Sequence, residues 1–129
     1  MLEPVDVREV WEAAEPMISA LLEKTPQDSR PVDVYTACFN NNATMFMPDN
    51  DDSGLLVVSV KENQFTGEIY LFVWMAYHKD SNAQERYSAE IEDIAYKHRC
   101  AYIEFESRRR GFQRRGDWET MNTTFRKRI

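Results

Sequence analysis

Five arginines stand close together near the end of the chain, directly after a predicted strand. They are Arg108, Arg109, Arg110, Arg114 and Arg115. Guanidinium groups bind phosphates and carboxylates through paired, charge-assisted hydrogen bonds, so this cluster could hold a phosphate or a carboxylate-rich protein partner. The arginines could equally pair within the chain, and the available carboxylates are Glu90, Glu92, Glu104 and Glu106. The sequence does not favour either interpretation.

Charge is distributed unevenly along the chain. Residues 1–107 carry 8 basic and 20 acidic side chains, a net charge of −12, whereas residues 108–129 carry 8 basic and 2 acidic ones, a net charge of +6. Such asymmetry is typical of a surface that binds an acidic partner, although the basic end could instead fold back onto the acidic body. The acidic body would repel nucleic acid, so we expect a protein partner.

Two histidines and two cysteines are the other residues with reactive side chains. We predict that His78 lies in a loop and that His98 lies at the edge of a helix's core face, and neither has partners at metal-ligand spacing. Cys38 and Cys100 are not spaced as Cys-x-x-Cys, which favours reduced thiols in the core. There is no Ser/His/Asp or Cys/His signature and no Walker-type loop. We therefore predict no metal site.

Length and composition predict one globular domain over residues 1–129. The chain is 43% hydrophobic and 29% charged, which is ordinary for a globular protein. Only four glycines are present, which argues against a barrel rich in turns. We find no basic-then-apolar leader and no apolar run of membrane-spanning length. We therefore expect a protein that a standard signal does not export and that has no membrane partner.

Hydrophobic periodicity predicts two helices and then three strands. Apolar residues recur at spacings of three and four from Val7 to Leu22, and Pro16 should kink this helix or split it in two. A second, short helix begins at Pro31. Three β-type runs follow and predict an antiparallel meander, with strands over 43–47, 55–60 and 68–77 and turns over 50–54 and 63–67.

The second half of the chain predicts a helix between two strands. Ser81 and Gln84 form a capping box, and Tyr87 begins a helical face that ends near Arg99. That face comprises Tyr87, Ile91, Ile94, Ala95 and His98. Residues 101–106 should form a strand parallel to the one before the helix, reached by a right-handed crossover. A short basic helix over 108–115 and a last strand over 118–128 complete the prediction.

The predicted order, α-α-β-β-β-α-β-α-β, resembles the GCN5-related N-acetyltransferase (GNAT) fold over nearly the whole chain. The end of the chain is similar to that of short GNAT-like proteins encoded by bacteriophages and prophages. The matching residues there are Cys100, Ile103, Glu104, Arg109, Arg110, Gly111 and Phe112, the last in place of the usual Trp. The resemblance implies an α+β fold with helices on both sides of a mostly antiparallel central sheet.

The resemblance also implies where an acyl-CoA binds in active members. They hold the pyrophosphate on a Gln/Arg-x-x-Gly-x-Gly/Ala motif, where backbone N–H groups at a helix N-terminus face the phosphates. Gln84 and Ala89 fit this motif, but Tyr87 stands at the essential glycine and Glu85 adds like charge. We expect the Tyr87 ring to occupy the space of the pyrophosphate, which leaves a degenerate motif and no cofactor. Capping by Gln84 and core packing by Tyr87 explain the same residues structurally.

The same resemblance identifies few candidate catalytic residues in this chain. The general acid of the family is often a tyrosine after the last short helix, and no tyrosine follows Tyr102. In some members a glutamate on the fifth strand serves as general base, which makes Glu104 and Glu106 weak candidates. Both alternate with Ile103 and Phe105, as residues on a solvated or salt-bridged strand face do.

Three functional classes follow from these observations. The leading hypothesis is a non-catalytic GNAT-like phage protein, found in the host cytoplasm or the virion. It would act through contacts with phage structural proteins or with itself, in virion assembly or as a virion component. The first alternative is an N-acetyltransferase with a diverged CoA site, which would use acetyl-CoA. The second is a small acidic effector that binds a host protein.

Overall fold

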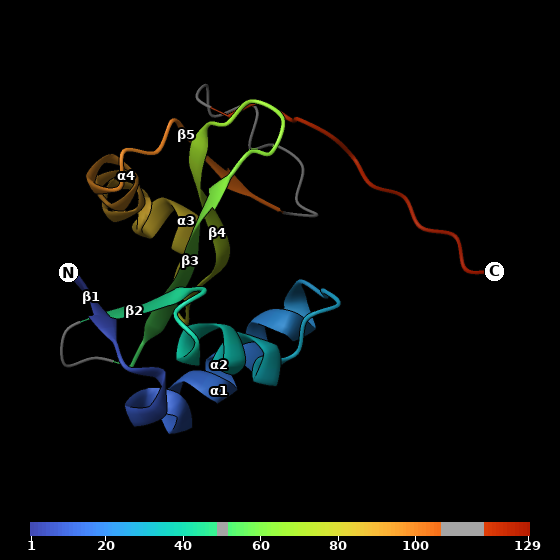
Figure 1. The fold of residues 1–129 in the computed structure, drawn as a ribbon. Helices are drawn as coiled ribbons and strands as arrows, with labels where there is room; N and C mark the ends of the chain where they lie inside the picture. The colour runs from blue at the N-terminus through green and yellow to red at the C-terminus, as the bar shows by residue number, and fades with distance from the viewer. Residues whose placement is uncertain (49–51, 107–117) are drawn as a thin grey trace.

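The computed structural model of the protein describes residues 1–48, 52–106 and 118–129 (Figure 1). Within these residues the chain forms five strands and four helices. Their order is β1 (Leu2–Val5), α1 (Val7–Lys24), α2 (Pro31–Phe39), β2 (Thr44–Pro48), β3 (Gly54–Glu62), β4 (Ile69–His78), α3 (Ala83–Arg86), α4 (Ser88–Lys97) and β5 (Tyr102–Phe105).

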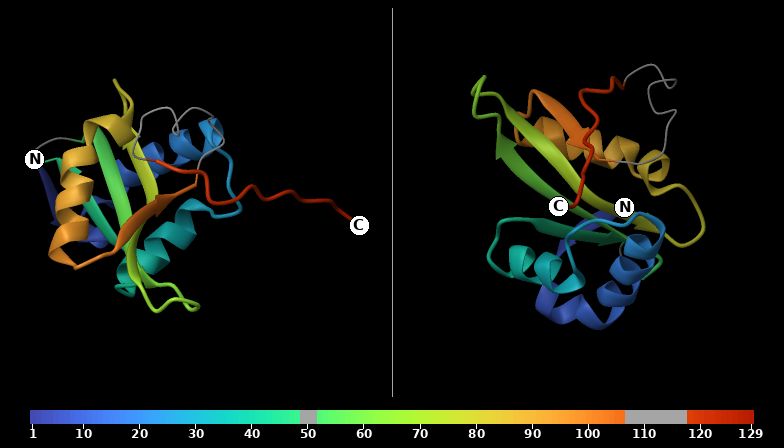
Figure 2. Two further views of the ribbon diagram at one scale, coloured as in Figure 1. Left: turned by 90° about the horizontal axis from the view of Figure 1, so that it is seen from above. Right: turned by 90° about the vertical axis from the view of Figure 1, so that its right-hand side faces the viewer.

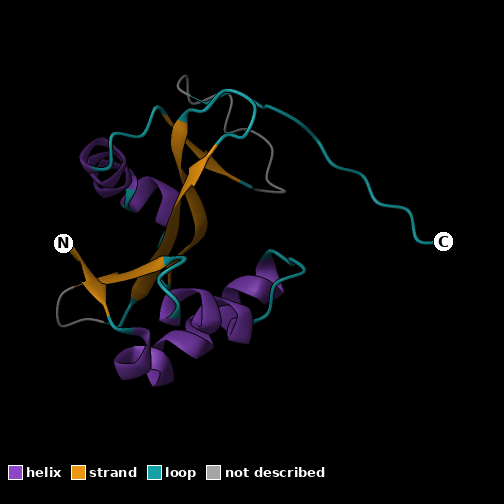
Figure 3. Cartoon of the chain, viewed as in Figure 1, coloured by secondary structure: helices purple, strands orange, loops and turns teal. Residues whose placement is uncertain are grey.

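The strands form one sheet in the order β1-β2-β3-β4-β5 (Figure 3). All neighbouring pairs are antiparallel except β4 and β5, which are parallel. The predicted meander is therefore confirmed as β2-β3-β4, and the predicted parallel strand as β5. The Asn63 carboxamide helps to close the turn between β3 and β4, because its Oδ1 accepts the Phe65 N–H at 2.9 Å.

Helices cover both faces of the sheet, as expected (Figure 2). On one face, Ile18 of α1 and Val34 of α2 pack with Leu55 and Val57. On the other face, Ile91 of α4 packs with the next residues along β3, Leu56 and Val58. Because successive strand residues point to opposite faces, the apolar run of β3 is buried on both sides.

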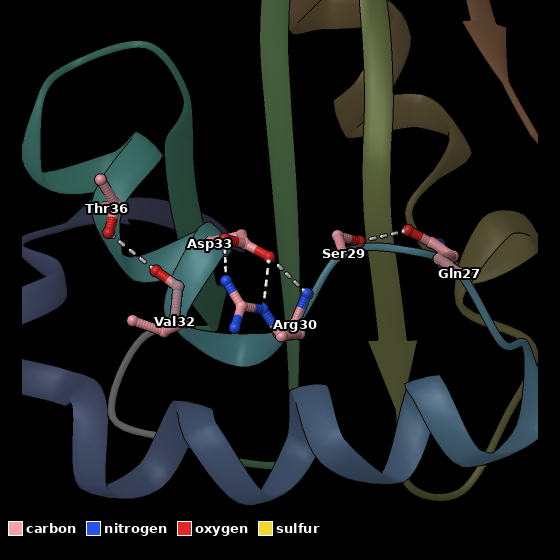
Figure 4. A network of polar contacts seen from close by, with 6 residues as sticks. All are labelled: Gln27, Ser29, Arg30, Val32, Asp33 and Thr36. Carbon is pink, nitrogen blue, oxygen red and sulfur yellow. Dashed lines mark hydrogen bonds and ion pairs between the residues drawn. The ribbon is translucent and has the colours of Figure 1, made fainter.

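Helix α1 runs unbroken through Pro16, which excludes the second of the two predicted effects of this proline, a split, and leaves a kink as a prediction. Proline lacks the N–H that would bond the Glu12 carbonyl four residues earlier. Pro16 and Glu12 are both exposed, so that carbonyl can bond water instead. Helix α2 begins at Pro31 as predicted, and the Asp33 carboxylate accepts the Arg30 backbone N–H at 2.8 Å (Figure 4).

The segment between β4 and β5 differs from the single helix that we predicted. Two helices are present, and Tyr87 lies between α3 and α4. Asn82 rather than Ser81 caps α3, and the predicted capping box is therefore wrong. His98 follows the last residue of α4 and is exposed, so it does not lie at a core edge.

The two ends of the chain also differ from the prediction. Strand β1 was not predicted, because Glu3 and Pro4 interrupt any apolar pattern in its four residues, and its pairing with β2 orders it instead. Residues 118–129 form no strand, which corrects the predicted last strand. The predicted basic helix over 108–115, with all five clustered arginines, lies outside the described residues. No helix in the described ranges is both long and apolar enough to span a membrane.

Candidate functional site

A β-bulge interrupts β4 at Trp74. In the ladder between β3 and β4, Val57 pairs with Met75 and Val58 pairs with Val73, which leaves Trp74 as the extra residue. After the bulge, each residue of β4 points to the face of the sheet opposite to the one that simple alternation would give it. Val73 packs in the core beneath α3 and α4, whereas Met75 packs in the core beneath α1 and α2. A bulge also bends its strand and increases the local twist.

Beyond this bulge, β4 continues without its parallel neighbour. The pairing of β4 with β5 runs from Tyr70↔Tyr102 to Val73↔Phe105, while β4 extends to His78. Among the described residues, no strand pairs with this edge of β4 past Val73. The carboxyl ends of the two parallel strands therefore part next to the N-terminus of α3.

A cleft of about 140 Å³ lies where the strands part. Its apolar wall includes Val73 and Trp74 of β4, Phe105 of β5 and Leu21 of α1. Its polar lining comes from three segments that are distant in sequence, and comprises Lys24, Thr25, Gln27, His78, Ser81, Asn82, Gln84 and Glu106. Apolar walls with a few convergent polar groups are the usual composition of a small-molecule site.

The N-terminus of α3 is closed by a side chain. The Gln84 and Glu85 N–H groups donate to Asn82 Oδ1 at 3.0 and 3.4 Å. The first N–H groups of a helix have no partner within the helix and are the groups that bind anions at helix N-termini. Here Asn82 already engages two of them, so they are not presented to the cleft in this conformation.

His78 is a site residue that the sequence analysis missed. It is the last residue of β4, not a loop residue as predicted, and only 9% of its surface is exposed. Its Nδ1 accepts the Asp80 N–H at 3.0 Å and lies 3.2 Å from Ser81 Oγ. A ring nitrogen that accepts a backbone N–H carries no proton, so the neutral ring is protonated on Nε2. The apolar run before His78 was the signal that β4 reaches this far.

Tyr87 is a core residue, as one interpretation of the sequence predicted. It is 4% exposed and packs beside His78, with ring centroids 6.3 Å apart. A Cβ added to Gly54 would overlap the Tyr87 hydroxyl oxygen, so Gly54 leaves room for this ring. Tyr87 lines a second cavity with Arg86 and Glu90, of about 380 Å³, and does not line the cleft. Its ring therefore does not fill this cleft, and the expectation that it occupies the space of a pyrophosphate stays a prediction.

The remaining predicted site residues are only partly brought together. Gln84 and Glu106 both line the cleft. Glu104 does not line the cleft. It lies near Tyr70 instead, where burial raises the pKa of the Tyr70 hydroxyl and the negative charge of Glu104 raises that pKa further. Ala89 is exposed on α4 and does not line the cleft either.

The two cysteines are free and half-buried. Burial raises the pKa of the Cys38 thiol to about 11, and burial also raises the pKa of Cys100. Both thiols are therefore protonated near neutral pH, which opposes nucleophilic or metal-ligand roles. The described part of the chain contains no group of three His, Cys, Asp or Glu side chains that could hold a metal ion.

Comparison with known proteins finds solved structures of similar fold but no match in sequence. No protein-family model matches the chain, and no curated protein matches it. A Bacillus halodurans protein superimposes with a TM-score of 0.76 at 8% identity, over 100% of this chain and 99% of that one.

Two further solved structures are named as acetyltransferases. One, from Trypanosoma brucei, has a TM-score of 0.69 at 8% identity and covers 100% of this chain and 99% of its own. The other is an aminoglycoside acetyltransferase from an uncultured soil metagenomic sample. It has a TM-score of 0.68 at 11% identity, over 100% of this chain and 95% of that one. At such low identity the likeness concerns the fold alone. The chain has the α+β fold of the GNAT acetyltransferases.

Proposed function

We propose that the cleft between β4 and β5 receives an acyl thioester and presents it to an amine acceptor, which makes the chain an acyltransferase with a diverged CoA site. The observation that carries this proposal is the parting of the two strands at the Trp74 bulge, next to the N-terminus of α3. The neighbours named as acetyltransferases support it, because this chain shares their overall fold.

The cleft fits the thioester end of an acyl-CoA. Val73, Trp74 and Phe105 offer an apolar surface to the chain that leads to the sulfur. Past Val73, the edge of β4 pairs with none of the described strands and can exchange hydrogen bonds with the amides of that chain, because backbone groups at a strand edge require partners. A volume of about 140 Å³ suits this end of the molecule and not the whole of it.

The residues at the N-terminus of α3 fit the pyrophosphate of CoA less well than the cleft fits the thioester end. Asn82 Oδ1 engages the Gln84 and Glu85 N–H groups that would otherwise face the phosphates. The Glu85 carboxylate, which is exposed, adds repulsion of like charge. We therefore expect weak binding of CoA, dominated by its thioester end.

Glu106 is the best-placed general base in this proposal. An amine must lose a proton when it is acylated, and a carboxylate within reach can accept it. Glu106 lines the cleft, whereas Glu104 does not. His78 has a different task, because its Nδ1 holds the Asp80 N–H and so fixes the turn that leads to α3.

Calorimetric titration with acetyl-CoA tests the proposal. We expect one site per chain, and at least about tenfold weaker binding in Ser81→Trp, because the added ring would fill the mouth of the cleft. Ser88→Trp is the matched control, since Ser88 is exposed and does not line the cleft. Absence of heat in the parent protein, or equal losses in both variants, would overturn the proposal.

A second candidate is the non-catalytic phage protein that acts through protein contacts in virion assembly or as a virion component. The capped N-terminus of α3 favours it, because this feature disfavours CoA. The arginine cluster would then be the partner surface. The protein should be found in purified particles or assembly intermediates. If it is missing from both, a pull-down giving one stoichiometric host protein would point to the acidic effector instead.

A further inference from the structure

A row of aromatic side chains leads away from the cleft along β4. Leu71 and Val73 pack in the core beneath α3 and α4, so the residues that alternate with them point to the other face of the sheet. Those residues are Tyr70 and Phe72. Trp74 comes next in the same row, packs against the core beneath α1 and α2, and lines the cleft. The aromatic row therefore starts at the cleft and runs toward the beginning of β4.

A second row lies beside the first, on β5. Tyr102 and Glu104 alternate with the two β5 residues that pack against the core beneath α3 and α4, so they share the face of the aromatic row. In the parallel ladder Tyr102 lies opposite Tyr70, and Glu104 lies opposite Phe72. Glu106, two residues beyond Glu104, lines the cleft. The second row therefore places carboxylates next to the rings of the first.

The end of the two rows that is farther from the cleft has an ordered arrangement. The Tyr70 and Tyr102 rings stack with centroids 5.0 Å apart and an interplanar angle of 6°. Asn63 Nδ2 donates to the Tyr102 hydroxyl at 3.0 Å, which attaches this pair to the turn between β3 and β4. Among the described residues, Tyr70, Phe72 and Tyr102 belong to neither core and are all partly exposed. The rings are therefore held in place and still accessible.

This face of the sheet already binds a cation of its own chain. Lys61 Nζ lies over the Phe72 ring, 4.3 Å from the ring centroid, which is within the range of a cation–π interaction. Glu104 lies opposite Phe72 across the ladder and adds negative charge there. A ring face next to a carboxylate attracts an ammonium group through both its quadrupole and its ionic partner. The rows thus have the chemistry of a binding site for organic cations.

We propose that the two rows form an acceptor track, which selects a linear amine that carries a second ammonium group. This inference rests on the proposed acyl transfer. The reacting amine would lie at Glu106 in the cleft, and the second ammonium at Glu104 and Phe72. Two residues along a strand span about 6.6 Å. Four or five methylenes hold two nitrogens roughly 6–8 Å apart in an extended chain, so the track selects acceptors of this length.

The track suits a methylene chain better than a peptide. The main-chain N–H and C=O groups of a sheet bond to neighbouring strands within the sheet, so the face of the sheet offers side chains alone. A peptide laid along this face would find no partners there for its own main chain, whereas methylenes need none. The aromatic row provides apolar surface for the methylenes, and the carboxylates beside it are spaced for the ammonium groups.

Amide-shift titrations of the full chain at neutral pH, without acetyl-CoA, test the track. The probes are cadaverine and pentylamine, which share a chain of five carbons and differ in the second ammonium. We expect cadaverine to bind roughly three- to tenfold more tightly, with its additional shifts at Phe72, Tyr102 and Glu104. Ethylenediamine is too short to reach both carboxylates and should show no such preference over ethylamine.

Two variants of nearly unchanged shape test the residues. Glu104→Gln should abolish the preference for cadaverine and leave the affinity for pentylamine unchanged, because only the second ammonium reaches Glu104. Glu92→Gln is its control, since Glu92 is exposed on α4 at the opposite face of the sheet. Lys61→Met should increase the affinity for cadaverine about two- to fivefold, because it removes the cation that competes at Phe72. Lys97→Met on α4 should not increase it.

Equal affinities of the parent for cadaverine and pentylamine would overturn the track, as would a preference that survives Glu104→Gln. A preference that Glu92→Gln lowers as much as Glu104→Gln would also overturn it, because that result reflects attraction to the acidic body as a whole. If the preference depends on Glu104 but acetyl-CoA gives no heat, the track stands and the acyl transfer fails. If acetyl-CoA binds as proposed but the two amines bind equally, the track fails and the acyl transfer stands.

Discussion

The Asn82 side chain accepts the Gln84 backbone N–H at 3.0 Å and thereby closes the N-terminus of α3. If the cleft receives an acyl-CoA as proposed, this contact should oppose binding of the pyrophosphate more directly than Tyr87 does. Tyr87 points into the core, whereas Asn82 lies in the cleft wall and holds the N–H groups that an anion would need. The contact is also easy to remove, because it depends on one side-chain oxygen.

Replacing Asn82 by Gly should increase the affinity for acetyl-CoA. The substitution frees the Gln84 and Glu85 N–H groups for the pyrophosphate, and Gly at an N-cap costs only a few tenths of a kcal/mol of stability. Asn82→Ser keeps a capping oxygen and should bind like the parent. Calorimetry on the three proteins checks this, and equal affinities of the Gly and Ser variants would show that the cap does not limit binding.

Glu106→Gln should slow acyl transfer by roughly 10²-fold or more, because the neutral amide cannot accept the proton of the amine. Glu104→Gln is the control on the same strand and should retain the parent rate, since Glu104 does not line the cleft. The measurement is the rate of CoA release with a monoamine acceptor at saturating acetyl-CoA. A larger loss in the Glu104 variant would reverse our assignment.

Gly54→Ala should destabilise the fold by about 1–3 kcal/mol, because its Cβ would overlap the Tyr87 hydroxyl and the Tyr77 carbonyl oxygen. Part of this loss should return in the background Tyr87→Phe, which removes one of the two overlapping atoms. Gly67→Ala offers a contrast. Its φ of 76° strains any side chain although no atom lies near, so it should cost about 1–2 kcal/mol that Tyr87→Phe cannot rescue. Urea unfolding of these variants measures the coupling.

The stability should fall as the pH rises from about 9 to about 11. Burial raises the pKa of the Cys38 thiol from 9.0 to about 11, so the folded state favours the protonated form. This contribution is fully present below pH 9 and is lost as the pH rises through the folded pKa. Cys38→Ala should flatten the decline in the free energy of unfolding. An unchanged slope in that variant would assign the decline to other groups.

The sequence predicted the sheet better than it predicted the site. The run from Leu55 to Val60 and the aromatic segment after Gly67 have one strong interpretation each, and both lie in the sheet. The bulge at Trp74 could not be predicted, because it depends on the register of β4 against β3. The sequence of β4 alone contains no pattern that indicates it.

Two local errors have simple physical origins. Ser81 and Asn82 are both good capping residues and adjacent, so a shift of one residue decides which of them caps α3. Alternation after Trp118 is typical of a strand, but a strand also requires a partner, and residues 118–129 pair with none of the described strands. The hydrogen bond from Arg126 to Asp28 joins residues 98 positions apart, which no local pattern reveals.

The most direct test of the account is a map of backbone amide shifts when acetyl-CoA is added to the labelled full chain. The account predicts the largest changes at Trp74, Asn82, Gln84 and Phe105, around the parting of β4 and β5. Shifts confined to Ser53, Arg86 and Glu90 would place the ligand in the second cavity. That result, or a spectrum unchanged at millimolar ligand, would contradict the proposal that the cleft receives an acyl thioester.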